Sequence, residues 1–194
     1  MEEDKIISGC KVVIIGGSAG SLNALMQILP ELPDLNGFAI VIVVHRKSTD
    51  DQTLEDLISL KSSIPFKIIE DKVPLVPGFV YVAPSNYHLL FEKNKTLSLD
   101  ISEKINYSRP SIDVSFESAA EIYGNSLVGI LLSGSNSDGT QGLKAIKAAG
   151  GTIAVQNPLS ADMPFMPNNA ILYTNPDFVL NINEILRFII SINS

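Results

Sequence analysis

The stretch KVVIIGGSAGSLNALMQIL, residues 11–29, constrains the fold more than any other part of the chain. Val12–Ile15 is a β-branched run, which is typical of a strand buried on both faces. The glycine-rich turn that follows leads into apolar residues at helical spacing, namely Leu22, Leu25, Met26, Leu29 and Leu32. A buried strand, a tight turn and an amphipathic helix in this order predict the first unit of an α/β fold.

Strand and helix patterns alternate along most of the chain. They predict a doubly wound, largely parallel sheet flanked by helices. Further buried strands are predicted at Phe38–Val44 and Ser126–Ser133, and further strands at Phe66–Glu70 and Thr152–Val155. Helices are predicted at about residues 53–60, between Pro110 and Gly124, from the turn at 134–139 to Ala149, and around residues 182–189.

The middle of the chain has a different pattern. The segments VPGFVYVAP (residues 76–84) and HLLFEKNKTLSLD (residues 88–100) predict short antiparallel strands, the second as a small hairpin insertion that turns near Asn94. The sequence contains no repeat, linker or low-complexity stretch. We therefore expect residues 1–10 to form an N-terminal tail and residues 11–194 to form one domain.

The composition limits the classes of function. With 194 residues, 45% of them hydrophobic and 18% charged, the chain is that of one globular domain. Its net charge of −7 argues against a general nucleic-acid role. The single cysteine excludes an internal disulfide, and the acidic start and the lack of a long apolar run argue against a secretory leader or membrane insertion. These features predict a cytoplasmic protein.

The turn after the first strand matches the pattern of a turn that exposes a serine nucleophile better than it matches a phosphate-binding pattern. A dinucleotide fingerprint needs G-x-G-x-x-G, and neither Gly16 nor Gly17 begins such a pattern. His45 stands where the dinucleotide-binding fold places an acidic residue. Gly16–Gly20 does match G-x-S-x-G, whose glycines permit a sharp turn that exposes Ser18. The amide of Ala19 is then a candidate oxyanion donor. A serine that only caps the next helix explains the same residues, so both interpretations stay open.

A serine nucleophile requires a base and a group that orients this base. His45 ends the second buried strand, so we expect it at the same edge of the sheet as Ser18. His88 lies in the irregular middle segment, where a surface or packing role is expected. Asp138 follows a buried strand at the same edge and is the candidate acid, although a helix N-cap would explain it equally. Asp113, inside a predicted helix, is a weaker rival.

Six stretches between about residues 11 and 171 resemble the catalytic domain of the chemotaxis protein-glutamate methylesterases, the CheB family. They are IGGSAGS, VVHR, VYVAPSNYHLL, SRPSIDVSFESAA, GILLSGSNSDGTQGLKAI and AVQNPLSADMPFMPNNAI. By this resemblance, the family's catalytic serine, histidine and aspartate match Ser18, His45 and Asp138. The resemblance implies hydrolysis of glutamate methyl esters on the cytoplasmic helices of a chemoreceptor, with release of methanol, and some members also deamidate glutamine. It implies no metal or organic cofactor.

Several positions depart from the family's pattern. Ser135 replaces a methionine that is common near the acid, and Arg46 and Lys47 replace a Met-Pro pair that is common after the histidine. Arg46 and Lys47 are therefore candidates for contacting an acidic receptor helix, although a solvated surface explains them as well, and Arg109 is a second candidate for lining the cleft. These departures keep open an alternative function, a non-catalytic module that binds a receptor or another signalling protein.

About ten residues precede the first strand, where typical family members carry a receiver domain and a linker. We therefore expect a stand-alone esterase that is active as purified and does not respond to a phosphodonor. Control would come from expression, from recruitment to the receptor, or from a separate receiver protein that docks over Ser18.

Overall fold

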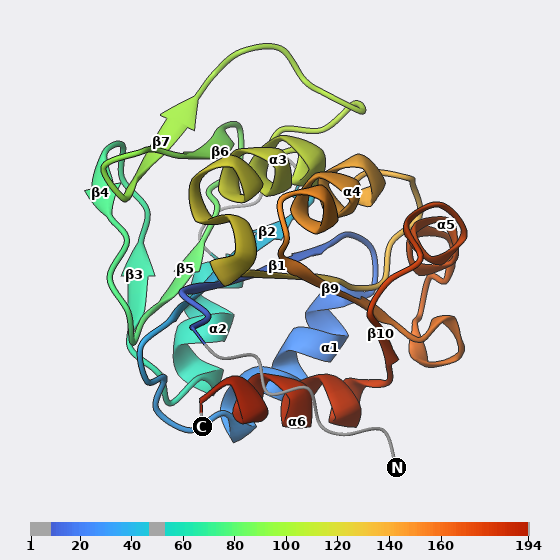
Figure 1. The fold of residues 1–194 in the computed structure, drawn as a ribbon. Coiled ribbons are helices and arrows are strands. Elements are labelled where there is room, and N and C mark those ends of the chain that lie inside the picture. Colours follow the sequence, from blue (N-terminus) through green and yellow to red (C-terminus); the bar gives the residue numbers. More distant parts are fainter. Residues whose placement is uncertain (1–8, 47–52, 194) are drawn as a thin grey trace.

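The β-branched runs form a seven-stranded parallel sheet in the computed structural model, which describes residues 9–46 and 53–193 (Figure 1). The spatial order of the strands is β10-β9-β8-β1-β2-β5-β3, and neighbouring strands pair in parallel. These strands are β1 (Val12–Gly17), β2 (Ala39–Val44), β3 (Phe66–Ile68), β5 (Val80–Val82), β8 (Leu127–Leu131), β9 (Thr152–Gln156) and β10 (Phe178–Leu180).

The chain winds outward from β1 in both directions, toward β3 on one side and toward β10 on the other. The direction of winding reverses between β1 and β8. In open α/β sheets, ligands bind beyond the carboxyl ends of the strands at such a reversal. The prediction of a doubly wound, largely parallel sheet is confirmed, and the reversal marks the place to look for a site.

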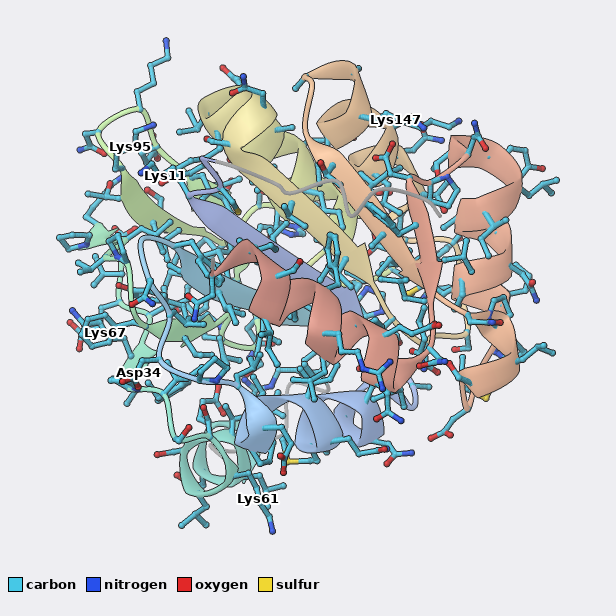
Figure 2. All side chains as sticks on the ribbon, turned by 60° about the horizontal axis from the view of Figure 1, so that its bottom comes forward. Lys11, Asp34, Lys61, Lys67, Lys95 and Lys147 are labelled. Atoms are coloured by element: carbon cyan, nitrogen blue, oxygen red, sulfur yellow. The ribbon has the colours of Figure 1, made fainter. Side chains whose placement is uncertain are left out.

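Helices cover both faces of the sheet (Figure 1). On one face lie α1 (Ser21–Ile28), α2 (Thr53–Lys61) and α6 (Ile182–Ile192), and on the other lie α3 (Ile112–Tyr123), α4 (Thr140–Ala148) and α5 (Phe165–Thr174). Figure 2 shows the first face, with α6 lying beside α1. Short 3₁₀ turns occur at Leu29–Glu31, Gly124–Ser126 and Pro158–Ser160.

The central strands are buried on both faces, which explains their continuous apolar sequences. In β1, Val13 and Ile15 pack into the core beneath α1 and α6, whereas Val12 and Ile14 pack into the core beneath α3 and α4. Lys11, directly before β1, lies at the amino edge of the sheet (Figure 2). The carboxyl edge, at the other end of the strands, carries the candidate site.

A smaller antiparallel sheet packs against α3. It contains β4 (Val73–Pro74), β6 (His88–Phe91) and β7 (Thr96–Asp100), in the order β4-β7-β6. The hydroxyl of Ser115 on α3 donates to the Leu89 carbonyl oxygen at 2.8 Å. The predicted hairpin is therefore confirmed, and the Lys95 N–H closes its turn by donating to the Glu92 carbonyl oxygen at 2.9 Å.

The prediction for residues 76–84 is wrong. This segment contains β5, which pairs in parallel with both β2 and β3 inside the main sheet. Tyr81 is fully buried there, and its hydroxyl donates to the Pro74 carbonyl oxygen at 3.1 Å and accepts the Val76 N–H at 2.9 Å. β5 is buried on both faces because Val80 and Val82 pack into the core beneath α1 and α6, and Tyr81 packs into the core on the other face. Its place between two parallel strands is not specified by its own sequence.

The structure also contains elements that the periodicity did not predict, namely α5, β10 and β4. In α1, the buried residues are Ser21, Ala24, Leu25 and Ile28. Leu22, one of the apolar residues at helical spacing, is 38% exposed. Within the described part of the chain, none of the helices is long and apolar enough to cross a membrane.

Candidate active site

Three neighbouring strands bring the predicted site residues to one edge of the sheet. Ser18 follows β1, His45 follows β2, and Asp138 lies in the segment between β8 and α4. Backbone hydrogen bonds join these strand ends. The Ser18 N–H donates to the Ser133 carbonyl oxygen at 2.9 Å, and the His45 N–H donates to the Gly17 carbonyl oxygen at 3.1 Å. Ser18 and His45 therefore start from positions that the sheet itself fixes.

The turn that carries Ser18 is sharp and is held from two sides. Gly20 adopts a φ of 81°, a left-handed conformation that favours glycine, and a Cβ there would lie 2.7 Å from Ser133 Oγ. The Ser133 hydroxyl donates to the Ala19 carbonyl oxygen at 2.7 Å, and the Ser21 hydroxyl donates to the Ser18 carbonyl oxygen at 2.6 Å. The helix α1 begins after Gly20 with no side-chain cap, so Ser18 does not cap it.

His45 and Asp138 are in direct contact. His45 Nε2 lies 2.6 Å from Asp138 Oδ2, and the Asp138 side chain is fully buried. A carboxylate only accepts hydrogen bonds, so in the neutral imidazole the proton resides on Nε2. The lone pair of Nδ1 is then the basic site of the ring.

Asn136 faces that second nitrogen. Its Nδ2 lies 3.4 Å from His45 Nδ1, and its Oδ1 accepts the Asp138 N–H at 3.0 Å. Because an N–H can bond only to the oxygen of the amide, the Asp138 backbone fixes which end of Asn136 faces the histidine. Asn136 was not among the site residues predicted from the sequence.

Asp138 does not cap the helix that follows it. The helix α4 begins after Gly139 with no side-chain cap, and the Asp138 carboxylate instead accepts the first two N–H groups of α3. Its Oδ2 lies 2.7 Å from the Ile112 nitrogen, and its Oδ1 lies 2.9 Å from the Asp113 nitrogen. The positive end of the α3 dipole therefore stabilises this carboxylate.

Three further donors complete the shell around Oδ1. They are Asn106 Nδ2 at 3.0 Å, the Gly139 N–H at 3.1 Å and Ser111 Oγ at 3.2 Å. Burial opposes ionisation of Asp138, but the hydrogen bonds from His45, Asp113 and Ile112 outweigh it and hold its pKa below the ordinary value. Asp138 is therefore an ionised, fully hydrogen-bonded carboxylate against the histidine ring.

A second buried carboxylate, Asp113, supports the segment that carries Asp138. Its Oδ1 accepts the Gly139 N–H at 2.9 Å and the Gly142 N–H at 2.8 Å, while Asn106 Nδ2 donates to its Oδ2 at 2.9 Å. Burial and the neighbouring charge of Asp138 raise the pKa of Asp113 to about 6, although the hydrogen bonds from Gly142 and Asn106 lower it. Asp113, our weaker rival for the acid, contacts Asp138 and not His45.

His88 is a buried structural residue, as its position in the sequence led us to expect. Its Nε2 contacts the Glu103 carbonyl oxygen at 2.8 Å, and its Nδ1 accepts the Ser111 N–H at 3.2 Å. The first contact requires a proton on Nε2, so both ring nitrogens are satisfied in the neutral form. His88 thus anchors the start of α3, whose N–H groups bind Asp138.

The remaining candidates lie in different surroundings. Arg46 is buried, and its guanidinium pairs with both carboxylate oxygens of Glu55 on α2. Arg109 donates from Nη1 to the Ile101 and Ser102 carbonyl oxygens, both at 2.9 Å. Ser135 is exposed in the segment before α4. Lys47 lies outside the described residues.

Ser18 and His45 line the same pocket, which has a volume of about 250 Å³. Arg46 also lines it, whereas Arg109 and Ser135 do not. Among the residues at 9–46 and 53–193, no group of three or more histidine, cysteine, aspartate or glutamate side chains could hold a metal ion. The arrangement suits acyl transfer, in which a serine hydroxyl, a histidine and a buried carboxylate act in sequence.

Comparisons with known proteins agree with this chemistry. The sequence matches the family model described as CheB methylesterase over residues 13–189. A putative protein-glutamate methylesterase/protein-glutamine glutaminase of Leptospira interrogans is 46% identical over 183 residues, which cover 94% of this chain and 95% of the relative. The corresponding Thermotoga maritima protein is 36% identical over 177 residues, 90% of this chain but 51% of the relative.

A solved structure is also similar. It is the crystal structure of the Thermotoga maritima CheB methylesterase catalytic domain, which superposes with a TM-score of 0.88 at 34% sequence identity. The match covers 93% of this chain and 97% of that structure. The likeness therefore extends over nearly the whole chain.

Proposed function

Because the chain belongs to the CheB methylesterase family, we propose that it is a protein-glutamate methylesterase whose catalytic triad is Ser18, His45 and Asp138. The relatives also carry the name protein-glutamine glutaminase, so we propose that the same site releases ammonia from glutamine. The substrate would be the methylated cytoplasmic helical region of a chemoreceptor. The protein would accordingly act in the cytoplasm.

One observation carries the assignment of roles. Asp138 holds His45 Nε2 at 2.6 Å, and the pocket that His45 lines is also lined by Ser18. The buried carboxylate fixes the tautomer that leaves Nδ1 as the base, and it stabilises the imidazolium that forms when the base takes up a proton. The three residues come from the ends of three adjacent strands, which favours a rigid site.

The proposed reaction has two stages. The Ser18 hydroxyl first displaces the weak contact of Asn136 at His45 Nδ1, and its oxygen attacks the ester carbonyl carbon while Nδ1 takes the proton. The carbon–oxygen bond to the alcohol then breaks, and Nδ1 returns the proton to the departing methanol. Water attacks the acyl-enzyme in the same way and releases glutamate and free Ser18. The Ala19 amide, in the turn before α1, is the candidate donor to the oxyanion.

The experiment measures methanol release from methyl-esterified receptor helical fragments. The wild-type protein should release methanol, and Ser18→Ala should lower the rate by about four orders of magnitude or more. Ser137→Ala, an exposed serine in the segment before α4, is the matched control and should retain the wild-type rate.

Two results would contradict the proposal. Equal rates for the wild type and Ser18→Ala would exclude Ser18 as the nucleophile. Binding of the fragments without release of methanol would favour the alternative function, a non-catalytic receptor-binding module.

A further inference from the structure

The pocket beside Ser18 and His45 has largely apolar walls. Leu22 of α1, Val44 at the end of β2, and Leu54 and Leu57 of α2 line it. The remaining lining residues that the structure describes are Ser18, Ser21, His45 and Arg46. The Arg46 guanidinium is directed at the Glu55 carboxylate, so its charge is neutralised at the wall.

The rim of the pocket is incompletely buried. Leu22 and Leu57, which both line the pocket, are 38% and 36% exposed. A ligand group that covers them would remove this apolar surface from water, which is favourable at roughly 25 cal/mol per Å². The pocket therefore favours an apolar occupant.

The alcohol of the proposed reaction does not account for the size of the pocket. Methanol has only two non-hydrogen atoms, whereas the pocket measures about 250 Å³. A substrate group that fills it would therefore come from the acyl part. On a helical substrate, side chains three or four positions from the esterified glutamate lie on the same face, close enough for one of them to enter.

We propose that this pocket is a binding subsite for an apolar group on the acyl side of the substrate, of the size of a leucine side chain or a short alkyl chain. The inference rests on the proposed function, because it takes Ser18 as the nucleophile. It also implies a further activity, the hydrolysis of small carboxylic esters with apolar acyl groups. Each turnover breaks the acyl–oxygen bond, consumes one water and releases an alcohol and a carboxylic acid.

The dependence on chain length follows from burial. Each methylene that enters the pocket should raise kcat/KM by about fourfold. From acetyl to butyryl, which adds two methylenes, the increase should be about 15-fold. Chains that outgrow the pocket should give no further gain.

The test is the rate of hydrolysis of p-nitrophenyl acetate, propionate, butyrate and hexanoate, each normalised to its uncatalysed rate. Leu57→Ser should lower the ratio of butyrate to acetate kcat/KM several-fold, because it makes one wall polar. Leu60→Ser is the matched control, since Leu60 lies on the same helix, is 82% exposed and does not line the pocket. Leu22→Ser repeats the test at the leucine that α1 contributes to the pocket, and Ser18→Ala defines the background.

Each outcome decides the matter. A butyrate-to-acetate ratio of about 15 that falls in Leu57→Ser and Leu22→Ser but not in Leu60→Ser supports the subsite. A flat or falling series overturns it, and so does an equal effect of Leu57→Ser and Leu60→Ser. If no small ester is hydrolysed while methanol is still released from receptor fragments, the subsite is wrong and the proposed function stands. If both activities are missing, the proposed function itself fails.

Discussion

Asp138→Asn separates the catalytic role of this residue from its structural role. Both carboxylate oxygens of Asp138 accept backbone N–H groups, Oδ2 that of Ile112 and Oδ1 those of Asp113 and Gly139. An asparagine has one oxygen and one NH₂ group at these two places, so its NH₂ must face a donor in either orientation. The substitution keeps the shape of the side chain but cannot keep its hydrogen bonds.

The consequence for His45 depends on which end of the amide it meets. If the NH₂ group takes the place of Oδ2, the ring must accept on Nε2 and carry its proton on Nδ1, where it no longer acts as a base toward Ser18. If the amide turns the other way, its NH₂ faces the donors of Asp113 and Gly139. We expect the first orientation to lower kcat by about 10⁴. Either orientation should also lower the free energy of unfolding by about 1–3 kcal/mol, because a buried donor loses its acceptor.

The assay pairs methanol release with chemical denaturation, and Asp113→Asn is the control. Asp113 binds the N–H groups of Gly139 and Gly142 in the same region, so the control should lose similar stability, but its side chain does not contact His45. We expect Asp113→Asn to keep its activity within about tenfold of wild type. Activity of Asp138→Asn within tenfold of wild type would refute this reasoning, as would equal losses of activity in the two variants.

Ser18→Ala and His45→Ala should each lower kcat by about four orders of magnitude or more. The double variant should lose little more, because the two residues act as one unit. Losses of kcat that multiply in the methanol assay would contradict this. Asn106→Gly removes the amide that bridges the carboxylates of Asp113 and Asp138, and glycine accepts the positive φ of this position. This substitution should lower kcat roughly tenfold. Tyr107→Gly, also at positive φ but with a fully exposed side chain, is the control and should not lower kcat. The pKa of Asp113 is raised from 3.8 to about 6, so the folded state binds more protons between these values, and the free energy of unfolding should fall as pH rises from about 4 to about 6. Urea denaturation across this range should show a smaller slope for Asp113→Asn, and an unchanged slope would show that Asp113 is not its cause.

The carboxyl edge of the sheet was predictable because the strands that form it can be identified locally. β1, β2 and β8 are apolar runs buried on both faces. Ser18 and His45 directly follow β1 and β2, and Leu132 and then Ser133 follow β8. Parallel strands end at the same edge, so Ser18, His45 and Asp138 could be placed together without knowledge of the helices. The contact between His45 and Asp138 follows from that placement, while the roles of all three in catalysis stay a prediction.

Elements defined by their neighbours were not predictable in the same way. β5 has only three residues, and its parallel pairing depends on β2 and β3 on either side. The apolar residues of α5 are not confined to its buried face, because Phe165 and Leu172 are exposed while Thr174 is buried. A periodicity rule therefore has nothing to detect in it.

The residues that hold Asp138 in place could also not be predicted from the sequence. Asp113 and Asn106 reach Asp138 from a helix and from an irregular segment, and only the fold brings them within hydrogen-bond distance. A local signal did exist for the helix. Ser111 stands at its start, and the Ser111 hydroxyl accepts the Val114 N–H at 3.4 Å. That signal locates the N–H groups of α3, but not the carboxylate that binds them.

The central claim is that His45 activates Ser18 as a nucleophile. Its most direct test is the reaction of the intact protein with a fluorophosphonate, followed by the intact mass and by mapping of the modified peptide. The account predicts one adduct on Ser18 in the wild-type protein and a rate of labelling that falls by orders of magnitude in His45→Ala. An adduct on another residue, or labelling of Ser18 at the same rate without His45, would contradict it.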